Sequence, residues 1–295
     1  MGAEERPLTG LNERVCTDSR TTMSAFNRRL FLQATLGSVS LALLTSCSES
    51  APAVTPTPLP LRFAVASDGH LGEPSTDSDQ FYADLLAALT RAHKQNPLQF
   101  VVINGDLIHQ GNDGLLPKAK AYLDTLPVPY YVTRGNHDRV SVAVWQQLWG
   151  YGTNHVVERD NATLVLLDTS NEAGDTLCGD DIWLRQALKT ARTDVPVFLF
   201  MHIPFIHNLA GTDVCNALVA VLADFPSVRA VFHGHDHTKD QSIVYQGAAL
   251  LFDAHFGSSW GTPYRGYRIV ESAGKQLSTY QYDFVNQKQI NSLVF

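Results

Sequence analysis

The sequence predicts an α/β (α+β) domain in which two mixed sheets pack face to face and helices cover their outer sides. From residue 61 onward, short apolar runs alternate with amphipathic segments in the order β-α-β-α-β, which is typical of a sheet covered by helices. Later runs follow one another with only turn residues between them, and these indicate a second sheet. The 295 residues are 44% hydrophobic and 17% charged, which excludes a disordered or collagen-like chain.

The first 46 residues are predicted to be an N-terminal extension with an export signal, outside the globular domain. Arg28 and Arg29 precede an apolar stretch that ends at Leu44 and is interrupted by polar residues. This stretch is shorter than the ~20 unbroken apolar residues that a membrane-spanning helix needs. The paired arginines resemble a bacterial twin-arginine signal, and Met23 is a candidate start site. An ordinary N-terminal anchor helix is the alternative.

Membrane attachment is expected at Cys47. Leu44-Thr45-Ser46-Cys47 resembles a lipoprotein cleavage box, in which the cysteine is lipidated and becomes the first mature residue. Residues 47–60 are rich in Pro, Ser, Ala and Thr, which predicts a flexible tether. The expected location is therefore the bacterial cell envelope. Cys178 and Cys215 remain in the mature domain, and the sequence leaves open whether they form a disulfide.

The elements of the domain, residues 61–285, follow from their apolar patterns. Near-continuous apolar runs predict buried strands at 61–66, 100–103, 130–133, 195–201 and 228–232. Apolar residues at helical spacing predict helices over 81–92 and 184–191, the second capped by Asp180 and Asp181. The consecutive strands of the second sheet are predicted at 153–158, 163–168, 242–245, 248–252, 267–271 and 277–282. Residues 286–295 are expected to be a tail.

The charge of the chain argues against nucleic acid as a partner. The formal net charge is −7 with a pI near 5.8, and lysines and arginines are scattered without a basic tract. Binding to a polyanion would need a clustered basic surface.

Acidic, amide and imidazole side chains follow the C-terminal ends of the five buried strands. In order along the chain they are Asp68 and His70, Asp106, Asn136, His202, and His235 and His237. The carboxyl ends of strands in open α/β sheets are where loops converge on ligands. One such residue alone would be typical of a turn, but the conjunction of Gly135-Asn136-His137-Asp138 with Gly234-His235-Asp236-His237 predicts one metal-binding rim.

This ligand set suits two divalent or trivalent transition-metal ions. Carboxylate, carboxamide and imidazole together favour Mn, Fe, Zn or Co over Mg or Ca, which prefer oxygen ligands. Seven ligands are too many for one closed tetrahedral ion and enough for two that share a bridging carboxylate. Two such ions would leave the site with a positive charge that attracts a phosphate group.

The ordered motifs around these residues, together with Gly105-Asp106, resemble the calcineurin-like metallophosphoesterase family over residues 62–283. Among its branches the chain is most similar to class III cyclic-nucleotide phosphodiesterases. The resemblance implies a four-layer αββα sandwich. It also implies a first metal held by Asp68, His70, Asp106 and His237, and a second held by the bridging Asp106 with Asn136, His202 and His235.

The resemblance further implies in-line attack by a hydroxide held between the ions, with His137 giving a proton to the leaving alkoxide. The chain departs from the family at His109, where an aspartate commonly orients the proton donor. Either His109 contacts His137, which leaves the protonation state of His137 open, or His109 faces solvent. Arg134 is expected on the surface, with a phosphate contact as the alternative.

The function predicted on these grounds is hydrolysis of a small phosphate ester, as a phosphodiesterase in preference to a monoesterase. A non-catalytic metal-binding or sensing lipoprotein is the alternative, and a mononuclear zinc amidase is disfavoured by Asn136 and the surplus of ligands. Nucleotides are among the candidate substrates, and Trp260, Tyr264 and Arg265 could wall a nucleotide pocket or close a packed hairpin. The sequence leaves the substrate, the metal and the oligomeric state open.

Overall fold

The computed structural model describes residues 60–110, 113–206, 215–273 and 276–295. The predicted export signal, the predicted lipidation site Cys47 and most of the tether lie outside the described residues. Within the part that the structure describes, no helix has the length and apolar character needed to cross a membrane.

Each of two sheets has six strands. The first has the order β12-β11-β10-β1-β2-β3, with bounds Lys288–Val294, Gln276–Asp283, Gly266–Ala273, Arg62–Ala66, Val101–Asn104 and Tyr130–Thr133. The second has the order β4-β5-β6-β7-β9-β8, with bounds His155–Arg159, Ala162–Leu167, Val197–Met201, Val228–His233, Ala248–Phe252 and Ser242–Tyr245. Both sheets mix parallel and antiparallel pairs, as predicted.

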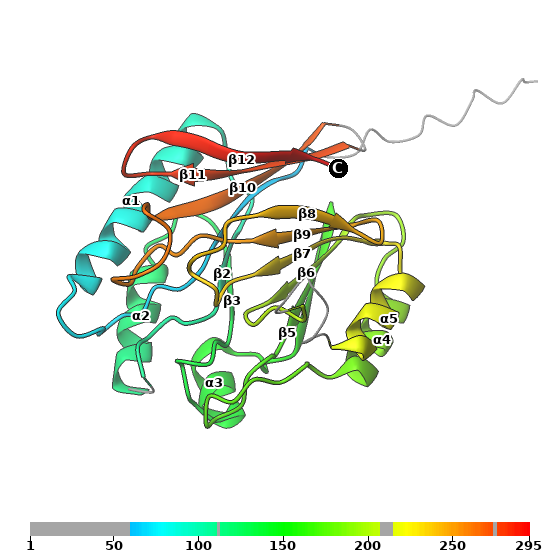
Figure 1. Ribbon diagram of the computed structural model, residues 1–295, viewed down its shortest axis with the longest axis horizontal. Helices are drawn as coiled ribbons and strands as arrows, with labels where there is room; N and C mark the ends of the chain where they lie inside the picture. The colour runs from blue at the N-terminus through cyan, green and yellow to red at the C-terminus, as the bar shows by residue number, and fades with distance from the viewer. Residues whose placement is uncertain (1–59, 111–112, 207–214, 274–275) are drawn as a thin grey trace, which may run out of the picture. The chain divides into compact units, whose positions relative to one another are not determined.

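Helices cover the outer side of each sheet (Figure 1). Those beside the first sheet are α1 (Ser78–Gln95) and α2 (Leu116–Leu123), the latter preceded by the short 3-10 helix η1 (Asp113–Leu115). Those beside the second sheet are α4 (Asp181–Thr190) and α5 (Asn216–Asp224). Helix α3 (Val142–Trp149) follows β3 in the chain. Its Trp145 side chain is buried in the apolar cluster between the first sheet and its helices.

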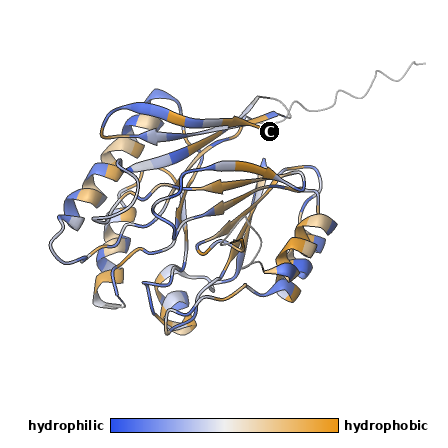
Figure 2. Cartoon of the chain, in the orientation of Figure 1, coloured by the Kyte–Doolittle hydropathy of each residue, from blue (hydrophilic) through white to orange (hydrophobic). Residues whose placement is uncertain are grey.

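Three buried apolar clusters separate the four layers. The first packs α1 and α2 on the outer face of the first sheet, the second packs α4 and α5 on the second sheet, and the third lies between the sheets. Apolar colour accordingly dominates the central strands of the second sheet, while the helices carry both apolar and polar residues (Figure 2). Burial of apolar area at these three interfaces is the main favourable term for folding. The four-layer αββα sandwich is confirmed.

Side-chain caps fix where the main helices begin. The Asp180 carboxylate accepts a hydrogen bond from the Trp183 N–H at 2.9 Å, as predicted for α4. At α1 the Asp77 carboxylate accepts from the Gln80 N–H at 3.3 Å. Each cap satisfies an N–H that has no partner in the first turn and contributes about 1 kcal/mol to stability.

The assignment of strands to sheets was partly wrong. Strands β6 and β7, expected beside β1 to β3, pair with β5 and β9 in the second sheet, while β10 pairs antiparallel with β1. Residues 286–295, expected to be a tail, contain β12, which pairs with β11. Except for the β11–β12 hairpin, these pairings join segments that are separated in sequence, so local apolar patterns carry no information about them.

One disulfide and one buried ion pair join different segments of the described chain. Cys178 and Cys215 form a disulfide, with 5.5 Å between their Cα atoms, which resolves the question that the sequence left open. Arg268 and Asp253 form a fully buried ion pair between the sheets, with 2.6 Å between Nε and Oδ1. Burial raises the pKa of Asp253 to about 7, and the Arg268 guanidinium opposes that rise.

Candidate metal centre

The loops that follow β1, β2, β3, β6 and β7 meet at one rim formed by both sheets. Backbone hydrogen bonds join them: the Gly69 N–H donates to the Asp106 carbonyl at 2.9 Å, and the Gly234 N–H donates to the His202 carbonyl at 2.9 Å. The loops approach so closely that a Cβ at Gly135 would collide with Asp106. The rim therefore holds the predicted ligand residues in fixed relative positions.

The first group of possible ligands is Asp68, His70 and His237. All three side chains are buried, and one ligand atom from each lies within 4.8 Å of the others. His237 Nε2 is 3.1 Å from His70 Nε2 and 3.1 Å from Asp68 Oδ1. Two imidazole nitrogens and a carboxylate oxygen thus point at one location, as the ligands of a metal ion do.

The second group is Asp106, His202 and His235, whose ligand atoms also lie within 4.8 Å of one another. His202 Nε2 is 3.1 Å from Asp106 Oδ2. The amide oxygen of Asn136 completes this group, at 3.2 Å from His202 Nε2 and 2.9 Å from His235 Nδ1. The structure therefore brings together all seven residues that the sequence singled out as candidate ligands.

Asp106 lies between the two groups. Its Oδ2 atom is 3.1 Å from His202 Nε2 and 3.5 Å from His70 Nε2. Its other oxygen, Oδ1, accepts a hydrogen bond from the His137 N–H at 2.8 Å. One carboxylate oxygen is thus within reach of both groups, which is the position that a bridging ligand requires.

Four of the seven residues have a left-handed backbone conformation. The φ angles are 61° at Asp68, 43° at His70, 51° at Asp106 and 68° at His235. A non-glycine residue held in this region costs about 1–3 kcal/mol, and such residues cluster at functional sites. The sharp turns let residues directly after a strand direct their side chains into the rim.

The Asp68 carboxylate remains ionised, and the pKa values of the neighbouring imidazoles shift in opposite directions. Burial alone would raise the pKa of Asp68, but His237 and His202 hold it well below its usual range. Burial lowers the pKa of His70 to about 3. Burial also opposes protonation of His202, yet Asp106 and Asp68 raise its pKa to about 10.

Metal uptake by the metal-free protein is therefore expected to release protons and to weaken as the pH falls. His202, with a pKa near 10, holds a proton at neutral pH that a metal ion must displace. Each displaced proton makes the apparent affinity rise about tenfold per pH unit. Calorimetric titration with Mn²⁺ at pH 6 and pH 8, in buffers of different ionisation enthalpy, measures both effects. An affinity independent of pH would contradict this view of His202.

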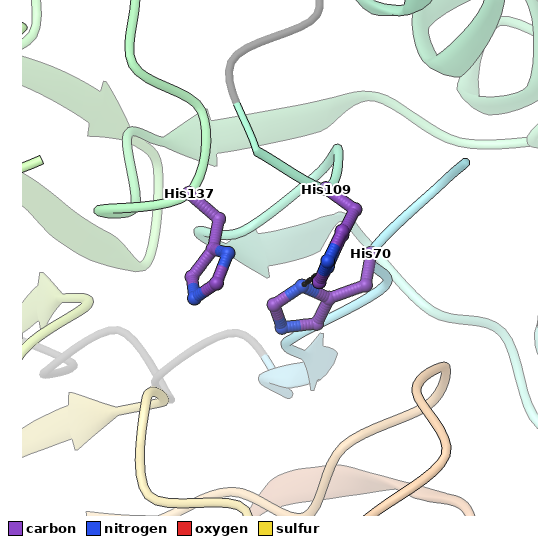
Figure 3. A group of neighbouring side chains, drawn as sticks. All are labelled: His70, His109 and His137. Atoms are coloured by element: carbon purple, nitrogen blue, oxygen red, sulfur yellow. Dashed lines mark hydrogen bonds between the residues drawn. The ribbon is translucent and has the colours of Figure 1, made fainter. Parts of the chain in front are cut away.

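His137 and His109 lie beside the first group (Figure 3). His70 Nδ1 is 3.2 Å from His109 Nδ1, and the His109 ring stacks on the His137 ring with 5.2 Å between centroids. His109 is thus in contact with His137, as the first of the two expectations held. Burial lowers the pKa of half-buried His137, against the opposing effect of Asp106. His137 Nδ1 has no hydrogen-bond partner among the described residues.

Asp138 holds two loops of the site together, a role that we did not predict from the Gly135-Asn136-His137-Asp138 motif. Its Oδ2 accepts from the Gly135 N–H at 2.7 Å and its Oδ1 accepts from the Ile108 N–H at 3.1 Å. Burial and the charge of Asp106 raise its pKa to about 7. Asp138 joins the loop after β3 to the loop after β2 and so fixes Asn136 and His137 against Asp106.

Arg134 is neither at the surface nor free to contact a phosphate. It is 3% exposed, and its Nη2 lies 2.5 Å from Asp168 Oδ2 and 2.6 Å from the Ser170 carbonyl. Its Nη1 donates to the Val140 carbonyl at 2.6 Å. All three contacts hold neighbouring loops together, so both interpretations of Arg134 were wrong.

The donor set at the rim fits divalent transition-metal ions. The buried nitrogens and oxygens converge on two adjoining locations, and mixed imidazole and carboxylate ligands suit such ions. A third group whose ligand atoms lie within 4.8 Å consists of His70, His109 and His137. It shares His70 with the first group and has no carboxylate.

Comparison with known proteins gives a consistent picture. A protein named "Probable cyclic nucleotide phosphodiesterase" from Rhodopseudomonas palustris is 33% identical over 132 residues, which are 41% of this chain and about half, 48%, of that protein. A 3′,5′-cyclic-nucleotide phosphodiesterase from Nostoc sp. is 26% identical over 194 residues, 61% of this chain and 72% of that protein.

The fold is similar to that of a solved structure. The crystal structure of a dimetal phosphatase from Danio rerio aligns with a TM-score of 0.62 over 80% of this chain and 98% of that one, at 15% identity. A likeness at this identity concerns the fold alone. Residues 61–239 match the family model described as calcineurin-like phosphoesterase, which is more than half of the chain. The chain therefore belongs to the calcineurin-like phosphoesterase family.

Proposed function

We propose that the protein is a phosphodiesterase that depends on two metal ions. The observation that carries the proposal is the position of Asp106, whose Oδ2 lies within 3.5 Å of a ligand nitrogen in each group. Family membership and the two relatives named as cyclic-nucleotide phosphodiesterases support the same class of reaction.

The proposed roles follow the two groups. Asp68, His70 and His237 would hold the first ion with Asp106, and Asp106, Asn136, His202 and His235 would hold the second. Two such ions, when bound, would supply positive charge that stabilises the phosphoryl oxygens and would lower the pKa of bound water. The mixed nitrogen and oxygen ligands favour Mn, Fe, Zn or Co.

The protein side chains position the reactants and supply a proton. The left-handed turns at Asp68, His70 and Asp106 hold the ligand atoms in place before substrate arrives, so little reorganisation is needed. His137 lies beside His70, with 4.7 Å between the ring centroids, and its imidazole suits a group that donates a proton to the leaving alkoxide. Its backbone N–H bond to Asp106 keeps it beside the reacting phosphate.

The function is tested with a panel of phosphate esters on protein of measured metal content. The proposal expects hydrolysis of bis-nitrophenyl phosphate and of 3′,5′-cyclic AMP when about two equivalents of Mn²⁺ are bound, with slower release from phosphomonoesters. Metal-loaded protein that hydrolyses none of them would favour the alternative, a non-catalytic metal-binding or sensing lipoprotein.

His137→Ala is expected to slow hydrolysis of esters with poor leaving groups by about 10²–10⁴-fold and to affect nitrophenyl esters far less. A nitrophenolate leaves without a proton, whereas an alkoxide does not. The two rates are measured on variant protein with unchanged metal content. Equal losses on both substrates would remove His137 from the role of proton donor.

We also propose that the protein is exported and held at the bacterial envelope by lipid on Cys47. The support is the sequence Leu44-Thr45-Ser46-Cys47 and the arginine pair upstream of it. The full chain expressed in a bacterium is expected in the membrane fraction, and the Cys47→Ser variant in the soluble fraction. Equal distribution of the two proteins would contradict a lipid anchor at this residue.

A further inference from the structure

A pocket of about 500 Å³ opens beside the metal-binding rim. It is formed largely by the loop between β9 and β10 and by the turn after β11. Its lining includes Ser258, Trp260, Thr262, Pro263, Tyr264 and Val285. A volume of this size is within the range of sites that hold small molecules.

Trp260 belongs to both the pocket and the rim. Its ring stacks on the His237 ring, with 4.5 Å between centroids and 7° between planes, and lies 5.2 Å from the His70 ring. It nevertheless remains 44% exposed. An exposed indole that touches two candidate metal ligands is within reach of a group attached to a bound phosphate.

The loop that carries Trp260 is fixed at three points. The Ser259 N–H and hydroxyl donate to Glu73 at 3.1 and 2.5 Å. The Tyr264 hydroxyl donates to Asp240 at 2.6 Å, and Arg265 pairs with Asp84 at 2.9 Å. The wall is therefore formed before a ligand binds, which reduces the entropy lost on binding.

Glycine brings this loop against the rim. Gly261 has a φ of 125°, and a Cβ there would lie 2.6 Å from His237 Cβ and 2.8 Å from His255 Cδ2. Any other residue would push the loop away from His237. The close approach keeps the Trp260 ring parallel to the imidazole.

The chemistry of the pocket favours a flat, uncharged group. Its charged lining residue, Arg265, is occupied by Asp84 and lies over the Phe81 ring at 4.3 Å. The other lining side chains are aromatic, aliphatic or hydroxyl-bearing, apart from the His255 imidazole, which contacts the carbonyls of Gly257 and Thr262. The Arg265 charge is already balanced by Asp84, whereas an aromatic ring could stack on Trp260.

We propose that this pocket binds the nucleobase of a nucleotide substrate, with Trp260 as the stacking surface. The proposal rests on the phosphodiesterase function and names its substrate class. Phosphate bound at the rim and base stacked on Trp260 would be parts of one molecule. Trp260 thereby becomes a residue that determines specificity.

The test compares 3′,5′-cyclic AMP with its abasic analogue, in which hydrogen replaces adenine. In the wild-type protein kcat/KM is expected to be higher for cyclic AMP, and Trp260→Leu is expected to lower the ratio of the two values by about tenfold or more, mainly through KM. Trp260→Phe, which keeps an aromatic face, is expected to retain part of the ratio. Equal losses on both substrates, at unchanged metal content, would overturn the proposal.

Binding of AMP supplies a second readout that does not need turnover. AMP is expected to quench tryptophan fluorescence of the metal-loaded wild type and of a control variant, Trp183→Phe, but not of Trp260→Phe. Quenching that persists in Trp260→Phe would overturn the proposal. If no diester is hydrolysed but AMP still quenches through Trp260, the phosphodiesterase function fails and the base site stands.

Discussion

Replacing Asp106 by asparagine is expected to lower kcat/KM for phosphodiesters by at least about 10³-fold and to reduce the number of bound metal ions. The Asp106 Oδ2 atom lies between the two ligand groups, and an amide has no negative charge to hold two cations together. Several kcal/mol of transition-state stabilisation depend on such ions, and about 4 kcal/mol corresponds to a 10³-fold change in rate. Elemental analysis and steady-state kinetics on the same preparation measure both effects.

A matched control is Asp224→Asn, which makes the same change of charge at the exposed end of α5, where Asp224 pairs with Arg185. Its activity and metal content are expected to equal those of the wild type. A fully active, metal-loaded Asp106→Asn protein would remove this residue from the bridging position and with it the main support for a dinuclear site.

Arg268→Ala is expected to lower the free energy of unfolding by about 3–5 kcal/mol. Arg268 is fully buried between the sheets, where it donates to Asp253 at 2.6 Å and to the Phe252 carbonyl at 2.9 Å. Its removal leaves a buried carboxylate without its counter-charge. Urea denaturation followed by circular dichroism measures the change.

The control for this experiment is Arg185→Ala, which breaks the surface pair with Asp224. Exposed pairs contribute at most about 1 kcal/mol because solvent screens them and ordering two long side chains costs entropy. Similar losses for Arg268→Ala and Arg185→Ala would contradict a special role for the buried pair.

The ligand residues could be predicted because each lies within four residues of the end of a strand that its apolar run predicts. Strands of this kind are recognisable locally, and the residue that follows them is placed at the sheet edge by chain geometry alone. The glycines before Asp106 and Asn136 also indicated tight turns at these positions. The helices α1 and α4 were recognisable from regular apolar spacing, and α4 also from its acidic cap.

The burial of Arg268 and Arg134 depends on which distant segments pack together, and local sequence patterns do not show this. Arg268 alternates with Tyr267 and Ile269 in β10, a pattern that suggests a solvent-facing arginine. The second sheet covers that face instead, and Arg268 is buried. Arg134 was misjudged for the same reason, since its partner Asp168 comes from another part of the chain. Helix α5 is apolar over most of its nine residues and has no clear period.

The distribution of the ligands over both sheets has a consequence for how the protein acquires its metal. Neither sheet alone supplies a complete ligand group, because the first and second groups each combine residues that follow strands of the first sheet with residues that follow strands of the second. A metal ion can therefore bind fully only after both sheets have formed and packed together. If the proposed export signal carries an already folded chain out of the cell, the cytoplasmic ion pool would determine which metal is bound.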